Sequence, residues 1–270
     1  MGSKDKIQIR GVILRVDVEN LYILGVYPYI FFTGIGLVLS FLCFALLLKR
    51  GCHDINENNI NFLISLGGLL VGAKLFGVIT SLLVAWNQNE KITASAFLNS
   101  GIVFYGGLVG FLTTFWCVHK IQYKNVDYHV MDIVAVCIPL FHCFARLGCF
   151  FAGCCYGELI DTPISVLYKT AYLEAALRIP VQLIEAAANL IIFVICLAFL
   201  IKHILPQKIL LLYLFLYAFV RFLLEFIRGD IVRGFVGIFS LSQIVSLIIF
   251  AFVFFQILKF KFKHRKKEAV

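Results

Sequence analysis

Charged side chains are scarce in this sequence. Only 14% of its 270 residues are Asp, Glu, Lys or Arg, whereas a soluble globular domain has about 25%. Hydrophobic residues make up 61% of the chain and the mean hydropathy is +0.96. A water-soluble fold of this length has no use for so much apolar surface, so the composition excludes a soluble protein and predicts a helical membrane protein.

Several other features are missing. The first twenty residues contain no continuous apolar stretch followed by a small-residue cleavage site, so we expect no cleavable signal peptide. Residues 1–22 are expected instead to form an arm on the protein or the membrane surface. No internal repeat and no low-complexity segment is visible, so residues 1–270 are expected to form a single transmembrane domain.

Apolar runs recur along the chain, and each is long enough for an α-helix to cross a hydrocarbon core of about 30 Å. We therefore expect an all-α, polytopic fold with about seven transmembrane helices. Segment 152–179 is partly apolar and partly charged, and we expect it to form a small outer-face region, with a short interfacial helix as one option. The seven expected spans are 23–48, 60–85, 101–119, 130–151, 180–201, 209–228 and 235–258.

Positive charge is concentrated at the carboxyl terminus. The formal net charge is +9, and six of the 24 basic residues fall in the tail 259–270, directly after an apolar run. This placement is typical of a cytoplasmic anchor at anionic lipid headgroups, so we expect no nucleic-acid partner. A cytoplasmic tail and seven spans put segment 152–179 on the outer side. The short loops support this orientation modestly, and the basic residues of the arm oppose it.

One stretch, "HCFARLGCFFAGCCYG" at 142–157, interrupts the apolar sequence with an arginine and four cysteines. Cys154 and Cys155 are neighbours and make poor disulfide partners, whereas Cys149 with either of them is geometrically possible. Zinc has weaker support, because the stretch has no CxxC pair and His142 completes no familiar ligand set. We favour small side chains packed in a tight loop, with His142 as a hydrogen-bonded core residue and no metal or cofactor.

Charges inside the spans need a reason, because each costs about 2.5–3.5 kcal/mol near the bilayer centre. In an α-helix, the spacing of Arg221, Glu225 and Arg228 places them on one face, with Glu225 able to pair with either arginine. A structural ion-pair network is one interpretation. Three arginines against two carboxylates leave a positive surplus, which favours a pocket for a phosphate-bearing lipid. The charges concerned are Lys74, Arg146, Glu185, Arg221, Glu225 and Arg228, with Gln182 one turn before Glu185.

Five motifs in order resemble those of the prolipoprotein diacylglyceryl transferases of bacterial cytoplasmic membranes. "FARLGCFFAGCCYG" is similar to the signature G-R-x-G-N-F-x-N-x-E-x-x-G, with Arg146, Gly148, Phe150 and Gly157 at matching positions. "IPVQLIEAA" resembles H-P-x-Q-L-Y-E, and "LYAFVRFLLEFIRGD" resembles Y-x-x-x-R-F-x-x-E-x-x-R. "YGGLVG" is similar to H-G-G-L-x-G, and "GIFSLSQIVSLIIF" to the G-Q-x-L-S segment. Together the motifs span most of the chain.

The resemblance implies transfer of diacylglyceryl from phosphatidylglycerol to the lipobox cysteine of a preprolipoprotein, with a thioether formed and glycerol phosphate released at the outer leaflet. It further implies that Arg146 and Arg221 stabilise the phosphate, that Glu225 orients Arg221, and that Tyr105 orients a substrate oxygen. The substrate-binding residues that it implies are Tyr27, Lys74, Gly106, Gly107, Gly148, Cys149, Gly157, Gln182, Glu185 and Arg228.

The chain departs from the family pattern at several of these positions. Tyr105 replaces a histidine, and a tyrosine with a pKa near 10 is a poorer base near pH 7 than an imidazole. Cys149 replaces the signature asparagine, and Lys74 stands where an arginine is usual. These changes leave two alternatives open: a related transferase with another lipid donor or acceptor, and a non-enzymatic lipid-binding or transport protein of the same fold.

Overall fold

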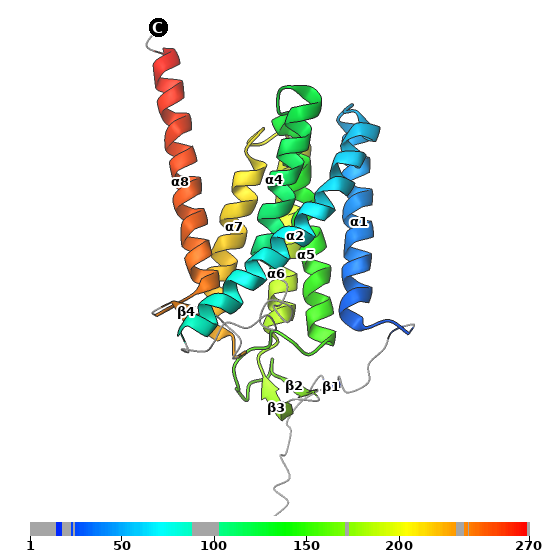
Figure 1. Cartoon of the computed structure of the whole chain (residues 1–270), viewed down its shortest axis with the longest axis vertical. Helices are drawn as coiled ribbons and strands as arrows, with labels where there is room; N and C mark the ends of the chain where they lie inside the picture. The colour runs from blue at the N-terminus through cyan, green and yellow to red at the C-terminus, as the bar shows by residue number, and fades with distance from the viewer. Residues whose placement is uncertain are drawn as a thin grey trace, which may run out of the picture.

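A computed structural model shows a bundle of long helices with a small β-sheet at one end (Figure 1). It describes residues 15–17, 23, 25–87, 103–170, 173–230, 235–236 and 238–268. Most of the expected amino-terminal arm lies outside the described residues. The last helix ends on the side of the bundle opposite the sheet, which gives the molecule two chemically distinct ends.

The helices coincide with the expected apolar runs. Six of them are long and apolar enough to cross a membrane, which confirms a multi-pass helical membrane protein. The remaining helix, α4, has 20 residues, a length of about 30 Å, and a seventh span stays a prediction. The α-helices of the described residues are α1 (Pro28–Arg50), α2 (Ile55–Asn87), α4 (Phe104–Tyr123), α5 (Tyr128–Phe151), α6 (Val181–Ile201), α7 (Ile209–Leu224) and α8 (Leu241–Glu268).

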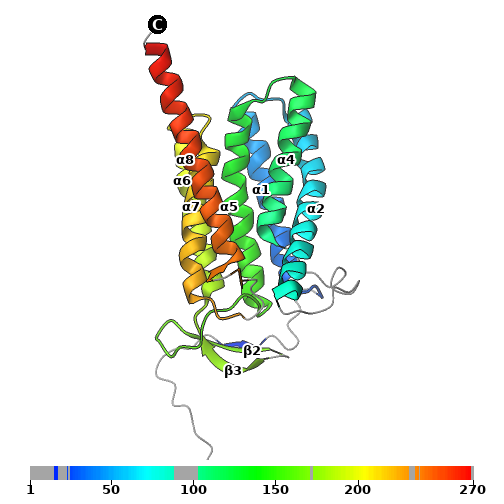
Figure 2. The ribbon, with the colours of Figure 1, turned by 60° about the vertical axis from the view of Figure 1, so that its left-hand side comes forward.

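Helix α5 forms the centre of the bundle and packs against α1, α6 and α7 (Figure 2). Val134, Ala135 and Val136 are fully buried on successive sides of α5, so neighbouring helices surround it. The Asp127 carboxylate caps its first turn by accepting a hydrogen bond from the His129 N–H at 2.9 Å. Side chains on α5 are therefore held by packing from several directions, which suits a helix that carries functional groups.

Helices α2 and α4 approach each other closely through glycine. A Cβ atom added to Gly72 would collide with the backbone of Gly106, and one added to Gly110 would collide with the backbone of Gly68. Two glycine pairs at a spacing of four residues thus face each other, the pattern by which membrane helices pack at short range. The close approach fixes α4 and the residues at its first turn relative to α2.

Segment 152–179 forms strands, and the option of an interfacial helix there is wrong. Strand β2 (Val166–Thr170) pairs antiparallel with β3 (Leu173–Arg178) and parallel with β1 (Arg15–Asp17), with Val166 opposite Arg178. The buried side chains alternate along β2, because Val166 and Tyr168 pack onto Phe150 at the end of α5. A second pair, β4 (Phe235–Val236) and β5 (Phe239–Ser240), precedes α8. The all-α expectation therefore needs this correction.

Candidate active site

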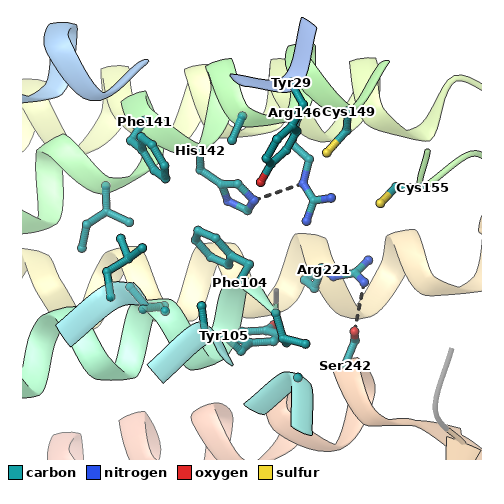
Figure 3. Close-up of a pocket in the computed structure, with 18 of the residues that line it drawn as sticks. Tyr29, Phe104, Tyr105, Phe141, His142, Arg146, Cys149, Cys155, Arg221 and Ser242 are labelled. Carbon is teal, nitrogen blue, oxygen red and sulfur yellow. Dashed lines mark hydrogen bonds between the residues drawn. The ribbon is translucent and has the colours of Figure 1, made fainter. Parts of the chain in front are cut away.

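A cavity of about 1090 Å³ lies inside the bundle and extends from Cys154 and Cys155, in the loop after α5, to Phe62 on α2 and Val134 on α5. Its walls come from α1, α2, α4, α5, α7 and the first turn of α8. Leu66, Phe111 and Phe141 line an apolar part, whereas Arg146 and Arg221 project into a polar part (Figure 3). A cavity of this size and division suits an amphipathic ligand, whose charged group and apolar body need separate surroundings.

Arg146 enters the cavity from the last turns of α5. Its Nε lies 3.1 Å from His142 Nε2 and 3.1 Å from Glu185 Oε2. Because Arg146 donates this hydrogen bond, His142 Nε2 acts as an acceptor and carries no proton. Within the described residues the other guanidinium nitrogens have no hydrogen bond, and Figure 3 shows them projecting into the cavity. One edge of the guanidinium is thus fixed, and the other faces the space where a ligand would sit.

Arg146 and Arg221 both lie near the ends of their helices. Arg146 lies five residues before the helix ends at Phe151, a rise of about 7.5 Å. Arg221 lies three residues before the end of α7 at Leu224. Both residues therefore lie near the sheet-side end of the bundle.

Glu185 holds Arg146 from behind. Its carboxylate is buried on α6 and accepts a hydrogen bond from the Tyr217 hydroxyl at 3.3 Å through Oε1. Oε2 faces Arg146, and Glu185 itself is absent from the cavity wall as described. Its position therefore favours orientation of Arg146 over direct contact with a ligand.

Arg221 enters the cavity from α7, across from Arg146. Its Nη2 donates to Ser242 Oγ at 2.9 Å and lies 3.0 Å from Glu225 Oε2. Its Nη1 is buried and has no hydrogen-bond partner within the described part of the chain. A buried guanidinium nitrogen without an acceptor is costly, so this atom favours a ligand that supplies one.

The three charges of the sixth apolar run do not form one continuous α-helical face. Helix α7 ends at Leu224, and Glu225–Ile227 is a turn of 3₁₀-helix. Glu225 is buried beside Arg221, whereas Arg228 donates to Asp230 at 2.8 and 2.5 Å. Within the described residues three arginines thus meet three carboxylates, because Asp230, which the expected count omitted, pairs with Arg228. Burial alone would lower the pKa of Arg228, but the hydrogen bond with Asp230 and the charges of Cys155 and Asp230 together outweigh this effect and raise it.

Tyr105 lines the cavity from the first turn of α4. Its hydroxyl lies 3.0 Å from Ser246 Oγ, which donates to the Ser242 carbonyl oxygen at 2.8 Å. Ser242 also receives the hydrogen bond from Arg221. Tyr105 is therefore connected to the Arg221 side of the cavity through two serines of α8.

Cys149, Cys154 and Cys155 gather where α5 gives way to the loop before β2. All three are free thiols, they line the cavity, and their Sγ atoms lie within 4.8 Å of one another. Thiol hydrogen bonds from Cys149 and Cys154 lower the pKa of Cys155 well below its ordinary value, and the charges of Arg146 and Arg228 add to this. Hydrogen bonds with Cys149 and Cys155 raise the pKa of Cys154.

Gln182 fixes the loop that carries these cysteines. Its Nε2 donates to the Cys154 carbonyl oxygen at 2.5 Å, and its Oε1 accepts from the Tyr168 hydroxyl at 3.1 Å. The loop is also hydrogen-bonded to the segment after α7, because the Glu158 N–H donates to the Ile227 carbonyl oxygen at 3.0 Å. Gln182 has no exposed surface, so its position favours a role in holding the loop.

The four glycines expected at the site lie in different places. Gly107 lines the cavity, whereas Gly106 lies at the contact of α4 with α2. Gly148 faces the backbone of Tyr29 on α1, where a Cβ would come within 3.2 Å of the Tyr29 Cα. Gly157 packs against Ile179 just before α6. Three of the four thus lie at close packing contacts around the cavity.

The last two expected residues differ in position. Tyr27 is at the rim of the cavity, with its hydroxyl 3.5 Å from the Ala152 carbonyl oxygen. Lys74 is half-buried on α2 and is not part of the cavity wall as described.

Three further residues line the cavity that were not predicted from the sequence to do so: His142, Asp230 and Tyr29. His142 was expected as a hydrogen-bonded core residue, which is confirmed, but it also lines the cavity and stacks on Phe104 with ring centroids 3.7 Å apart. Its position one turn before Arg146 was the available signal. Asp230 could have been found from its place two residues after Arg228, and Tyr29 offered no local signal.

Fold and site together define a multi-pass membrane protein with a lipid-sized cavity. Two arginines, Arg146 and Arg221, face each other at the polar end of this cavity. Comparison with known proteins gives the family: the profile of the prolipoprotein diacylglyceryl transferases matches residues 18–258. The chain belongs to this family of transferases, which confirms the resemblance seen in the motifs.

Individual relatives agree with this assignment. Phosphatidylglycerol–prolipoprotein diacylglyceryl transferase 2 of Clostridium perfringens is 30% identical over 246 residues, covering 87% of this chain and 91% of the relative. The phosphatidylglycerol–prolipoprotein diacylglyceryl transferase of Clostridium tetani is 30% identical over 87% of this chain and 94% of its own length. One from Campylobacter jejuni is 29% identical over 90% and 93%.

Proposed function

We propose that this chain transfers the diacylglyceryl group of phosphatidylglycerol to the thiol of a lipobox cysteine in a preprolipoprotein. The observation that carries the proposal is the pair Arg146 and Arg221, which face each other across the polar end of a cavity of about 1090 Å³. The family membership supports the same substrates, which appear in the names of the relatives.

The two arginines suit the phosphodiester of the donor lipid. Arg146 has its Nε bound to His142 and Glu185, and Arg221 has its Nη2 bound to Glu225 and Ser242. Each guanidinium is thus neutralised and oriented at one edge, with N–H groups left for phosphate oxygens. Fixed donors of this kind stabilise an anionic leaving group without reorganisation during the reaction.

The apolar part of the cavity suits the acyl chains of the lipid. Leu66, Phe111 and Val134 line it from three different helices, away from the arginines. Transfer of a methylene group from water into such a site contributes about 0.8 kcal/mol. The lipid comes from the bilayer, however, where its chains are already in hydrocarbon, so their burial in the cavity adds little binding free energy. The apolar part therefore serves to position the lipid, and the arginines supply the charge stabilisation.

The reaction that we propose is a displacement at the glycerol carbon that carries the phosphate ester. The acceptor sulfur forms a bond to this carbon, the carbon–oxygen bond to phosphate breaks, and its electron pair stays on the phosphate oxygen. Glycerol phosphate leaves with the charge held by Arg146 and Arg221, and the thiol proton passes to water. No enzyme nucleophile is needed, because the acceptor protein provides the sulfur.

The two ends of the bundle support an orientation in a bacterial cytoplasmic membrane. Lys49 and Arg50 end α1, and Lys120 lies in the last turn of α4, all at the end to which α8 runs. That end also carries the basic tail, and basic residues are typical of the cytoplasmic side. We infer that the carboxyl terminus is cytoplasmic and that the sheet and the cavity mouth face the outer leaflet.

The proposal is tested by mixing the purified protein with phosphatidylglycerol and a synthetic lipobox peptide. We expect release of glycerol phosphate and a peptide mass increase equal to one diacylglyceryl group. A peptide with serine in place of its cysteine is the matched control and should give neither product. Lipid exchange between vesicles without any modified peptide would overturn the proposal in favour of a lipid carrier.

A further inference from the structure

We propose that Cys149, Cys154 and Cys155 bind a thiophilic metal ion such as Zn²⁺, whose fourth coordination position is open to the acceptor thiol. The first half of this proposal, the metal site, rests on the arrangement of the three sulfur atoms. The second half, the acceptor thiol as fourth ligand, rests on the proposed function.

The geometry of the sulfur atoms suits a metal ion. A tetrahedral zinc centre with Zn–S bonds of about 2.3 Å places its sulfur ligands about 3.8 Å apart. The three Sγ atoms already lie within 4.8 Å of one another. A disulfide would use two of these sulfur atoms and leave the third unused, whereas one metal ion uses all three.

The loop is built to bring the sulfur atoms together. Cys149 is on the last turns of α5, and the chain turns sharply through Gly153 and Cys155, whose φ angles are +69° and +60°. The left-handed conformation is disfavoured for a cysteine, so surrounding contacts must hold it. The hydrogen bond from Gln182 to the Cys154 carbonyl oxygen is one such contact, at 2.5 Å.

The surroundings suit the charge of such a centre. Three thiolates and a divalent cation carry a net charge of −1. The guanidinium groups of Arg146 and Arg228 act electrostatically on the Cys155 sulfur, and these two arginines are themselves paired with Glu185 and Asp230. Sulfur ligands select soft or borderline ions such as Zn²⁺ over Mg²⁺ or Ca²⁺.

An open fourth coordination position would allow the metal to take part in the reaction by binding the acceptor thiol. Catalytic zinc sites keep three protein ligands and leave one position for a substrate, and a thiol bound there loses its proton. All three cysteines line the same cavity as Arg146, so a thiolate bound to the metal would lie beside the phosphate site.

Transfer from a metal-bound thiolate conserves atoms and charge. The acceptor S–H proton passes to water as the metal–sulfur bond forms. The sulfur then attacks the glycerol carbon, and the electron pair of the breaking carbon–oxygen bond leaves on phosphate. The thioether product is a weak ligand and dissociates from the metal. This route supplies the thiolate that Tyr105, which stands in place of the family's histidine, is poorly suited to generate.

Metal binding is tested on the full-length protein, purified with reductant and stripped of metal, with Co²⁺ as the probe. We expect one equivalent to bind and to give the intense visible absorption of tetrahedral thiolate coordination, which Zn²⁺ should displace. Cys154→Ser and Cys155→Ala should each weaken Co²⁺ affinity by more than the about 10–100-fold that loss of a supporting residue costs. Cys154 is exposed, so its substitution should leave folding intact.

Cys143→Ala is the matched control, because Cys143 is a buried cysteine of α5 that lies outside the group of three. It should bind Co²⁺ as the parent does. Failure of the reduced parent to bind Co²⁺ would overturn the proposal, and so would Cys154 and Cys155 variants that bind it unchanged.

The fourth position is tested by adding lipobox peptides to the Co²⁺ protein. The peptide with cysteine should shift the visible absorption, and the peptide with serine should not. Identical spectra with both peptides would overturn the role in acceptor binding. If transfer proceeds at full rate in metal-free protein, this inference fails while the proposed function stands. If Co²⁺ binds and the peptide is never modified, the proposed function fails.

Discussion

Arg146 and Arg221 occupy opposite walls of one cavity, and they are held in different ways. Arg146 is fixed through Nε by His142 and Glu185, two side chains from two helices. Arg221 is fixed through Nη2 by Glu225, on its own chain segment, and by Ser242 of α8. Arg146 is therefore held through Nε, whereas Arg221 is held through the terminal nitrogen Nη2.

We therefore expect Arg146 and Arg221 to differ in how well they tolerate substitution by lysine. A contact through Nε needs the planar guanidinium, because only arginine places a donor there while keeping two further nitrogens beyond it. A contact through one terminal nitrogen can be made by a lysine ammonium as well. Arg146 is thus specified by geometry, whereas Arg221 is specified more by charge and reach.

Removal of either arginine should have the largest effect on catalysis. Arg146→Ala and Arg221→Ala should each lower kcat/KM by about 10²–10³-fold or more, because each removes a preorganised donor to the leaving phosphate. Glycerol phosphate release from phosphatidylglycerol measures this directly. A variant at either position that keeps full activity would return that arginine to a purely structural role.

The lysine variants separate the two arginines. Arg146→Lys should lose about 10²-fold in turnover, because the ammonium cannot bind His142 and Glu185 and also reach phosphate. Arg221→Lys should lose only about 10-fold, since one ammonium can bind both Glu225 and Ser242. Both variants should fold as the parent does. Equal losses at the two positions would contradict the comparison.

The carboxylates that hold the arginines should matter for stability. Glu185→Gln and Glu225→Gln each leave a buried guanidinium without its counter-charge, which should lower the free energy of unfolding by about 3–5 kcal/mol. Thermal unfolding in detergent, followed beside transferase activity, measures the effect. The Glu185 variant should be the more damaging, because the single oxygen of an amide cannot accept from both Arg146 and Tyr217. Unchanged stability and activity in both would count against buried pairing.

Tyr105 should show the smallest effect. Tyr105→Phe removes one hydrogen bond to Ser246, worth about 0.5–1.5 kcal/mol, so turnover should fall only several-fold. Tyr105→His, which restores the family's residue, should be tolerated or should raise activity. A Phe variant as active as the parent would make this tyrosine a packing residue, and a His variant that is inactive would show that the surroundings have adapted to tyrosine.

The pattern of apolar and charged residues along the sequence was enough to predict the helices and to single out Arg146 and Arg221. The apolar runs located the helices, because crossing a bilayer imposes a length and a composition that no neighbour can alter. Their ends were less well predicted, as at α8, which covers Leu241–Glu268 where 235–258 was expected. Arg146 and Arg221 stood out because charge inside such a run is rare. Strand β2 was missed because its two buried residues, Val166 and Tyr168, alternate over too short a stretch to reveal a sheet.

The partners of the arginines could not be found in this way. Asp230 was left out of the charge count because it lies beyond the apolar run, yet it carries two hydrogen bonds from Arg228. The regular spacing of Arg221, Glu225 and Arg228 suggested one helical face, but α7 ends at Leu224 and the chain turns there. Spacing predicts a shared face only as long as the helix continues.

The sequence by itself determined that the protein crosses the membrane, which family it belongs to, and that arginines interrupt two of its apolar runs. Those properties depend on hydrophobicity and on local order along the chain. Only the tertiary structure decided which carboxylate pairs with which arginine, that His142 faces the cavity, and that three cysteines share one corner of it. These depend on contacts between segments far apart in sequence, and packing alone selects them.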